Sequence, residues 1–443
     1  MGRLFGTDGI RGVANVDLRP TLAYALGRAV AFHLAPGGGA LVTGQDTRRS
    51  GDMLSAAFVA GATSMGADVH RLGVVPTPAL AHIAGSGGFA AGVMVSASHN
   101  PAEDNGLKVL DSGGLKIDDA VEDELERLIW RADELVSPPN ERLGRDIDGG
   151  ALLDRYLAHR EALARSYRSD VRIVLDCANG SGGVVAPRIL AATGAAVEVI
   201  FNEPDGTNIN LGCGATAPGA LAAEVTARGA DLGLALDGDA DRLIAIDARG
   251  AVVDGDRLLG IVALDRLARG ALPGGILVVS ILSNGGLVAA VEAAGGTVVR
   301  TPVGDKYILD GMLVEGAGLG GEKSGHVIIR EHATSGDGVV TALELLAIMA
   351  RTGRPLDELA QRIALYPQQQ RTVKVRHKDQ WEADPQLGRA IAAATAELAG
   401  RGRVVVRPSG TEPALRIMVE GGDEAAVTRL ADRLAGLAAQ RLN

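Results

Sequence analysis

Short apolar runs rich in β-branched residues alternate along the chain with longer Ala-rich segments and with Gly-rich or polar loops. One order recurs three times: an apolar strand, a loop, an Ala-rich helix, a second strand, and later a third strand that ends in an unusual polar loop. The helical segments are too long for hairpins, so the pattern predicts parallel strands with right-handed crossovers. We therefore expect three similar parallel-sheet α/β domains.

The predicted strands of the three units share an apolar, β-branched composition. They span residues 40–43, 69–75 and 91–96 in the first unit, 171–176, 196–201 and 232–236 in the second, and 276–280, 297–301 and 317–320 in the third. Ligands collect at the carboxyl ends of parallel strands, where all three unusual loops lie. We therefore expect these loops to meet at a central cleft.

The rest of the chain has a different order of elements. A helix over 384–399, strands over 403–407 and 414–420 and a helix over 423–441 predict a smaller α+β domain. Candidate linkers lie near Pro138, Arg249 and Tyr366. The expected domains are residues 1–150, 151–250, 251–367 and 368–443.

Composition limits the partners and the compartment. The 443 residues are 47% hydrophobic and 22% charged, as in soluble globular proteins, and their net charge of −10 argues against a nucleic-acid partner. The two cysteines lack metal-site spacing, which favours a reducing compartment, and we expect a cytoplasmic protein. The N-terminus lacks a signal-peptide core, and the apolar stretches are interrupted by Gly and charges, so no membrane span is expected.

Three carboxylates alternate in the loop of the second unit, at Asp237, Asp239 and Asp241. At about 4 Å and an effective dielectric near 20, each pair repels by on the order of 4 kcal/mol, which a bound cation would offset. An EF-hand is excluded because Arg242 and Ala248 occupy its obligatory Gly and Glu positions. The alternatives are a site for Mg²⁺ with open coordination positions and a solvated acidic turn.

The loop of the first unit contains Ser98, His99, Asn100 and Pro101. Asn-Pro is typical of a turn. The alternative is a nucleophilic serine at a strand end, which needs a base or a metal for activation. Lys108 could shuttle a proton if its surroundings lower its pKa; otherwise it is a surface lysine.

Two further loops offer groups for a phosphorylated sugar, although each could be only a turn. The loop of the third unit provides Glu322, Ser324 and His326 for hydroxyl groups. The loop of the last domain provides donors suited to a phosphate, at Arg407, Ser409, Gly410 and Thr411, and Arg416 adds charge. Arg11 lies in a Gly-rich N-terminal loop that could equally be a turn with a structural ion pair.

Together these loops resemble the α-D-phosphohexomutase family, whose phosphoserine, metal, sugar and phosphate loops follow one another in this order. The resemblance covers nearly the whole chain and implies a phosphoryl group on Ser98. It implies one Mg²⁺ on Ser98, Asp237, Asp239 and Asp241. It also implies substrate contacts from Glu322, Ser324, Arg407, Ser409, Gly410 and Thr411. Arg11 and His99 then lie beside the phosphoserine, Lys108 is the first candidate for acid–base catalysis, and Arg242 contacts the substrate.

Within the family, residues 5–12, 204–210, 213–214 and 301–305 resemble the bacterial phosphoglucosamine mutases most. This implies interconversion of glucosamine 6-phosphate and glucosamine 1-phosphate, with a hexosamine 1,6-bisphosphate as intermediate and activator, for UDP-N-acetylglucosamine and cell-wall precursor synthesis. A phosphoglucomutase or phosphomannomutase uses the same parts. A noncatalytic phosphosugar-binding protein would have lost the serine or a metal carboxylate, and both are present. A homodimer is one expectation for the assembly.

Overall fold

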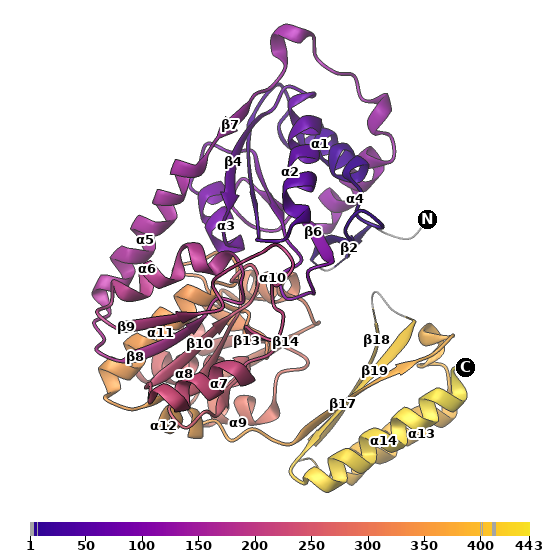
Figure 1. Ribbon diagram of the computed structural model, residues 1–443. Coiled ribbons are helices and arrows are strands. Elements are labelled where there is room, and N and C mark those ends of the chain that lie inside the picture. The colour runs from indigo at the N-terminus through magenta and orange to yellow at the C-terminus, as the bar shows by residue number, and fades with distance from the viewer. Residues whose placement is uncertain (1–3, 7, 399, 401, 410–412) are drawn as a thin grey trace.

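A computed structural model describes residues 4–6, 8–398, 400, 402–409 and 413–443 of the chain. Figure 1 shows three α/β parts that lie against one another and a fourth part, built on strands β17–β19, that projects to one side near helix α9. We number these parts domains I to IV in chain order.

Domain I contains a seven-stranded sheet in the order β1-β2-β6-β5-β3-β4-β7. Its strands are β1 (Phe5–Gly6), β2 (Gly9–Val13), β3 (Ala40–Gln45), β4 (Asp68–Val74), β5 (Ala91–Val95), β6 (Asp104–Asp111) and β7 (Asp146–Asp148). Its helices are α1 (Pro20–Leu34), α2 (Ser50–Thr63), α3 (Thr77–Gly85) and α4 (Asp119–Ile129).

Domain II has five strands in the order β12-β11-β10-β8-β9, and domain III has four in the order β14-β13-β15-β16. The strands of domain II are β8 (Arg172–Asp176), β9 (Ala196–Ile200), β10 (Leu232–Leu236), β11 (Leu243–Asp247) and β12 (Val252–Val253); its helices are α5 (Leu153–Ser166), α6 (Ala186–Ala191) and α7 (Gly219–Arg228). The strands of domain III are β13 (Ile276–Ser280), β14 (Thr297–Thr301), β15 (Leu319–Gly321) and β16 (Val327–Ile329); its helices are α8 (Gly255–Ala268), α9 (Gly285–Ala293), α10 (Asp305–Glu315), α11 (Gly338–Thr352) and α12 (Leu356–Gln361).

The threefold repeat is confirmed at the level of strand pairing. In each domain the first strand pairs in parallel with both the second and the third, as β3 does with β4 and β5. The chain then returns antiparallel to the third strand, through β6, β11 or β16. These return strands were not predicted, so each sheet is mixed rather than purely parallel. Each unusual loop therefore connects a buried parallel strand to its antiparallel neighbour.

Domain IV has an antiparallel sheet in the order β17-β19-β18. Its elements are β17 (Gln368–Lys374), β18 (Gly402–Pro408), β19 (Ala414–Gly421), α13 (Pro385–Glu397) and α14 (Glu424–Arg441). One sheet face carries alternate apolar residues, including Leu415, Ile417 and Val419, and packs with the two helices in a core separate from that of domains II and III. Domain IV is thus a distinct body with one covered sheet face.

Among the described residues, no helix combines the length and the apolar composition needed to cross a membrane.

Candidate active site

Ser98 lies in the loop between β5 and β6, and its side chain is turned toward domain II. Its hydroxyl donates a hydrogen bond of 2.5 Å to Asp237 Oδ2, and the residue is only 1% exposed. Its φ of 52° is in the left-handed region, which non-glycine residues adopt only when their surroundings hold them there. The backbone strain therefore aims the Ser98 hydroxyl at the aspartate loop of the neighbouring domain.

Arg48 holds the Ser98 loop in this conformation. It is fully buried, and its Nε pairs with Asp46 Oδ2 at 2.9 Å. Its two terminal nitrogens donate to four backbone carbonyls of the loop: Ser98 and Asn100 at 3.0 and 2.9 Å, Asp104 at 2.9 Å, and Pro101. An arginine has five donors in a rigid fork, and here every one has an acceptor on the Ser98 loop or on the Asp46 carboxylate.

Domain II also holds this loop. Asn210 Nδ2 donates to the carbonyls of Ser98 and Asn100 at 2.9 and 3.2 Å. The chain at Gly238 approaches so closely that a Cβ there would lie 2.5 Å from the Ser98 carbonyl oxygen. Side-chain bonding and close backbone approach together fix the loop against domain II.

We expect Arg48→Lys to lower kcat by about 100-fold while changing KM less than threefold, because a misplacement of the reacting group by ~1 Å has an effect of that size. A lysine has three donors on one nitrogen and cannot reach all these carbonyls. The measurement is steady-state kinetics beside the thermal unfolding midpoint. The matched control is Arg71→Lys, whose arginine forms an exposed pair with Asp146. A stable Arg48→Lys protein with the wild-type kcat would show that the Ser98 loop does not need the hydrogen bonds of Arg48.

Asp237, Asp239 and Asp241 project from the β10–β11 loop, and all three are buried. One carboxylate oxygen of each lies within 4.8 Å of the others. Asp239 Oδ2 accepts from Thr77 Oγ1 at 2.6 Å and from Lys108 Nζ at 2.9 Å. In contrast, Asp239 Oδ1 and Asp241 Oδ1 are buried without a hydrogen-bond partner among the described residues. Buried acceptors without donors, in a cluster of hard oxygen ligands, fit a divalent cation such as Mg²⁺.

The surrounding charges shift the pKa values of Asp237 and Asp241 in opposite directions. Burial and the charges of Asp241 and Asp239 raise the pKa of Asp237 well above its usual value. Burial also acts to raise the pKa of Asp241, but His326 and Lys108 outweigh it and lower that pKa. Arg242 and the Ser98 hydroxyl oppose this shift without outweighing it, so Asp237 is incompletely compensated by the protein, and a cation would supply the remaining charge.

Lys108 comes from the return strand β6 and points into the aspartate cluster. It is 1% exposed, 2.9 Å from Asp239, and 3.3 Å from Asp8 in the N-terminal loop. Burial acts to lower its pKa, but Asp239, Asp8 and Asp241 outweigh burial and raise it. The surrounding carboxylates thus favour the charged form of Lys108, and its role in acid–base catalysis stays a prediction.

A group of charged residues surrounds Lys108. Asp8 pairs with Arg11 and with Lys116, and Lys116 also pairs with Asp305 of domain III. Burial acts to raise the pKa of Asp8, but these cations hold it well below its usual value. Arg11 additionally donates to the Ala97 carbonyl at 3.2 Å. The N-terminal loop is thus part of the site rather than only a turn.

His99 lies beside Ser98, and Arg242 lies beside Asp237. His99 Nδ1 is 3.3 Å from Ser98 Oγ, and burial together with Arg242 and Arg11 lowers the His99 pKa to about 4. His99 is therefore neutral at neutral pH. Arg242 Nε lies 3.9 Å from carboxylate oxygens of both Asp237 and Asp241 and has no hydrogen-bond partner within the described part of the chain.

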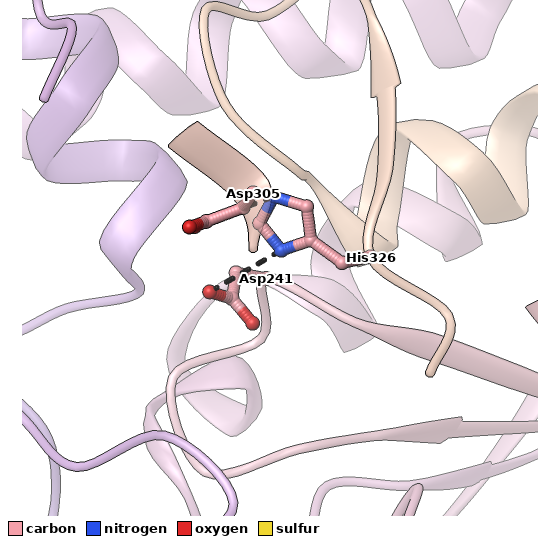
Figure 2. Close-up of side chains that lie close together, drawn as sticks. All are labelled: Asp241, Asp305 and His326. Atoms are coloured by element: carbon pink, nitrogen blue, oxygen red, sulfur yellow. Dashed lines mark ion pairs between the residues drawn. The ribbon is translucent and has the colours of Figure 1, made fainter. Parts of the chain in front are cut away.

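The β15–β16 loop brings Glu322, Ser324 and His326 to the same region. Figure 2 shows His326 between Asp241 and Asp305; its Nδ1 is 3.6 Å from Asp241 and its Nε2 is 3.8 Å from Asp305. Burial acts to lower the pKa of His326, but Asp241 outweighs it and raises that pKa. The Gly336 N–H donates to His326 Nε2 at 3.1 Å and orients the ring, whose Nδ1 faces Asp241 of the β10–β11 loop.

The rest of this loop offers groups to a ligand. Ser324 Oγ is buried and has no hydrogen-bond partner among the residues described here. One oxygen of Glu322 accepts from the Gly304 N–H at 3.1 Å, which fixes the carboxylate. A buried hydroxyl beside a fixed carboxylate is suited to a sugar hydroxyl group.

In domain IV, two arginines lie directly opposite each other on neighbouring strands. Arg407 of β18 pairs in register with Arg416 of β19. Burial, followed by the charge of Arg416, lowers the pKa of Arg407, while Glu322 of the β15–β16 loop opposes this. Like charges in this position destabilise a sheet unless an anion lies between them. Ser409 is buried at the strand end, and Gly410 and Thr411 lie outside the described residues.

The arrangement brings a serine hydroxyl, an acidic cluster, a buried lysine and the β15–β16 loop into direct or near contact. Arg48, Asn210, Thr77, Asp8, Lys116 and Asp305 were not expected as site residues. The motifs containing Asp8 and Asn210 were visible, but nothing in the sequence indicated which side chains cross the domain boundaries. Chemically, the group can hold a phosphoryl group and a cation at Ser98 and an anionic ligand farther along, at the arginine pair.

Comparisons with known proteins give one consistent result. Models of the phosphoglucomutase/phosphomannomutase domains match in order: domain I over residues 2–136, domain II over 154–250, domain III over 254–366 and the C-terminal domain over 372–437. A phosphoglucosamine mutase of Moorella thermoacetica is 53% identical over 426 residues, which cover 96% of each chain.

Two solved structures extend the comparison. The crystal structure of a phosphoglucomutase/phosphomannomutase family protein from Burkholderia thailandensis has a TM-score of 0.84 at 27% identity, covering 99% of this chain and 98% of that one. The N-acetylphosphoglucosamine mutase of Aspergillus fumigatus, solved with GlcNAc-6P and magnesium, has a TM-score of 0.72 at 20% identity, covering 99% of this chain and 96% of the other. The latter similarity concerns the fold alone.

Proposed function

The chain belongs to the phosphoglucomutase/phosphomannomutase family, and on that premise we propose that it interconverts glucosamine 6-phosphate and glucosamine 1-phosphate through a phosphorylated Ser98. The observation that carries the proposal is the contact of 2.5 Å between Ser98 Oγ and Asp237 across two domains. A buried serine with a strained backbone, bonded to a carboxylate cluster, does not fit a surface turn. It is well placed to carry a phosphoryl group.

The reaction consists of two phosphoryl transfers: the first removes the phosphoryl group from Ser98, and the second supplies Ser98 with another. First, the sugar 1-hydroxyl attacks the phosphorus on Ser98: the bond from O1 to phosphorus forms, the bond to Oγ breaks, O1 loses its proton and Oγ gains one. The 1,6-bisphosphate then turns end for end. Next, Ser98 Oγ loses its proton and attacks the 6-phosphorus, the bond to O6 breaks, and O6 gains a proton. Glucosamine 1-phosphate leaves, and the phosphoenzyme is restored.

The residues around Ser98 divide this task. Asp237, Asp239 and Asp241, with the phosphorylated serine, would hold Mg²⁺, which neutralises charge on the transferred phosphoryl group. Arg11 supplies positive charge beside the Ser98 loop, and Lys108 and Arg242 supply it beside the aspartate cluster. Catalysis of this kind depends on positioning and electrostatics. Charged groups that pair with one another, as Lys108 does with Asp239 and Arg11 with Asp8, are held in place and are suited to it.

The remaining loops would bind the nonreacting part of the substrate. Glu322 and Ser324 would contact sugar hydroxyl groups, and Arg407, Ser409 and Arg416 would hold the phosphate that is not being transferred. The opposed arginines support this assignment, because a phosphate dianion between them removes their repulsion.

The test of substrate choice is a side-by-side assay of the wild-type enzyme with glucosamine, glucose and mannose 6-phosphates. We expect kcat/KM to be highest for glucosamine 6-phosphate by at least about tenfold, because a site that hydrogen-bonds a substrate group rejects analogues that lack it. Equal or higher efficiency on glucose or mannose 6-phosphate would assign the enzyme to the phosphoglucomutase or phosphomannomutase reaction instead.

We expect Arg407→Ala to raise KM by about tenfold or more and to release additional free bisphosphate, because a charge-assisted contact contributes roughly 1.5–3 kcal/mol. The measurement is product analysis at saturating substrate, with the bisphosphate quantified beside glucosamine 1-phosphate. Arg371→Ala removes an arginine of the same domain that pairs with Asp432 and serves as the control. A wild-type KM with no additional bisphosphate would mean that the substrate phosphate does not bind at Arg407.

A further inference from the structure

Three side chains form one row across the domain IV sheet, at the end opposite the phosphate loop. Gln368 of β17 and Arg403 of β18 both lie opposite Glu420 of the central strand β19. Arg403 Nε pairs with Glu420 Oε1 at 2.9 Å, and Gln368 Nε2 donates to Glu420 Oε2 at 3.1 Å. Glu420 is only 1% exposed. This row, Gln368–Glu420–Arg403, is called the latch row below.

The latch row holds a loop of domain III. Residues 281–285 follow the carboxyl end of β13 and lead into α9. Arg403 donates to the Ile281 carbonyl at 2.6 Å and to the Ser283 carbonyl. Gln368 donates to the Leu282 carbonyl at 3.0 Å, and Glu420 accepts from the Gly285 N–H at 3.1 Å. Each member of the row therefore bonds directly to this one loop.

The latch row also reaches the sugar-binding loop. Lys323 lies between Glu322 and Ser324, and its Nζ donates to Gln368 Oε1 at 2.8 Å. The backbone of this loop is tied in turn to the start of α8, where the Gly255 N–H donates to the Lys323 carbonyl at 3.1 Å. One lysine side chain thus links the β15–β16 loop to the latch row.

The latch row and the arginine pair lie on the same face of one rigid sheet. Arg407 follows Arg403 by four residues on β18, and Arg416 precedes Glu420 by four on β19. Because side chains alternate along a strand, both rows project from the face that the domain IV helices do not cover. At a rise of about 3.3 Å per residue, the rows are roughly 13 Å apart. A rotation of the sheet about the latch row therefore moves Arg407 and Arg416 by several ångströms.

We propose that the latch row sets the position of the phosphate-binding arginines relative to domain III, and that Lys323 couples this position to the sugar-binding loop. This inference rests on the proposed function, because it assigns Arg403, Glu420, Gln368 and Lys323 as positioning residues for that reaction. The contacts are polar and several are made to backbone carbonyls, so they can break and reform as the bisphosphate turns and the domain grips its other phosphate.

The test compares Arg403→Ala and Lys323→Met with the control Arg371→Ala, which removes one positive charge from domain IV outside the latch row. We expect Arg403→Ala to raise KM by roughly tenfold, as the loss of charge-assisted bonds does, with kcat at saturation within about threefold of wild type. Lys323→Met, at an exposed position that cannot threaten folding, is expected to raise KM by roughly threefold. Both variants should release more free 1,6-bisphosphate per turnover than the control.

Small-angle X-ray scattering without substrate provides a readout that does not depend on activity. We expect Arg403→Ala to have a larger radius of gyration than wild type, and Arg371→Ala to match wild type. An Arg403→Ala protein with the radius of gyration and the KM of wild type would overturn the latch proposal. Equal changes in the control Arg371→Ala would also overturn it. A wild-type enzyme without mutase activity on any hexose phosphate would refute the proposed function, whereas expanded scattering in Arg403→Ala would still support the structural role of the row.

Discussion

Ser98→Ala is expected to give a folded protein that binds metal and sugar phosphate but has lost turnover by at least on the order of 10⁴-fold, because a double transfer through the enzyme has no other acceptor. The fold should be unaffected, because the Ser98 loop is held through its backbone by Arg48 and Asn210 rather than through the hydroxyl. The measurement is coupled mutase activity beside the thermal unfolding midpoint and metal binding by calorimetry.

The matched control for this experiment is Ser86→Ala, which removes an exposed serine hydroxyl at the end of α3. It should leave activity unchanged. A stable Ser98→Ala protein that retains wild-type turnover would exclude the phosphoserine mechanism altogether.

Removal of the divalent metal is expected to have the second largest effect. Chelation should lower activity by roughly 10²–10⁴-fold, because a cation at a transferring phosphoryl group is worth several kcal/mol, and added Mg²⁺ should restore it. Asp239→Asn should lose most metal affinity as well as activity, because Asp239 Oδ1 is one of two oxygens of the cluster that are buried without a donor among the described residues. Titration of Mg²⁺ by calorimetry measures affinity independently of turnover.

Asp231→Asn is the control for charge removal, because Asp231 is an exposed aspartate of the same domain that bonds to the backbone of Arg172. It should bind Mg²⁺ as wild type does. Full activity of a protein verified to be free of metal, or an Asp239→Asn protein with wild-type Mg²⁺ affinity, would contradict the assignment of the acidic cluster.

The first and third strands of each repeat could be predicted because they are short, largely apolar runs that are mostly buried, as expected for strands covered on both faces. The return strands could not. Strand β6 reads Asp-Asn-Gly-Leu-Lys-Val-Leu-Asp, and its polar residues suggest a loop. Asn105 and Lys108 are nevertheless buried there, because Asn105 bonds to Ser50 at the start of α2 and Lys108 bonds to Asp239. Buried polar residues thus obscured the alternation of apolar and polar positions on which strand prediction depends.

The loops of the site could be located because unusual polar residues follow apolar strands at the ligand-binding edge. The contacts between them could not, because Arg48 and Asn210 act through backbone carbonyls of residues far away in the sequence. The pKa shift of Lys108 could not be predicted from the sequence for a similar reason. A single lysine in the sequence does not reveal the carboxylates that surround it in the folded chain, and those carboxylates determine the direction of its pKa shift.

The most direct measurement follows the phosphoryl group itself. Purified phosphoenzyme is given a single turnover of glucosamine 6-phosphate whose phosphate carries heavy oxygen, and both the Ser98 peptide and the product are analysed by mass spectrometry. The account predicts one phosphoryl group on Ser98 before turnover, heavy label on Ser98 afterwards, and unlabelled phosphate on the product glucosamine 1-phosphate. A labelled product from an enzyme that never carries the label would contradict it.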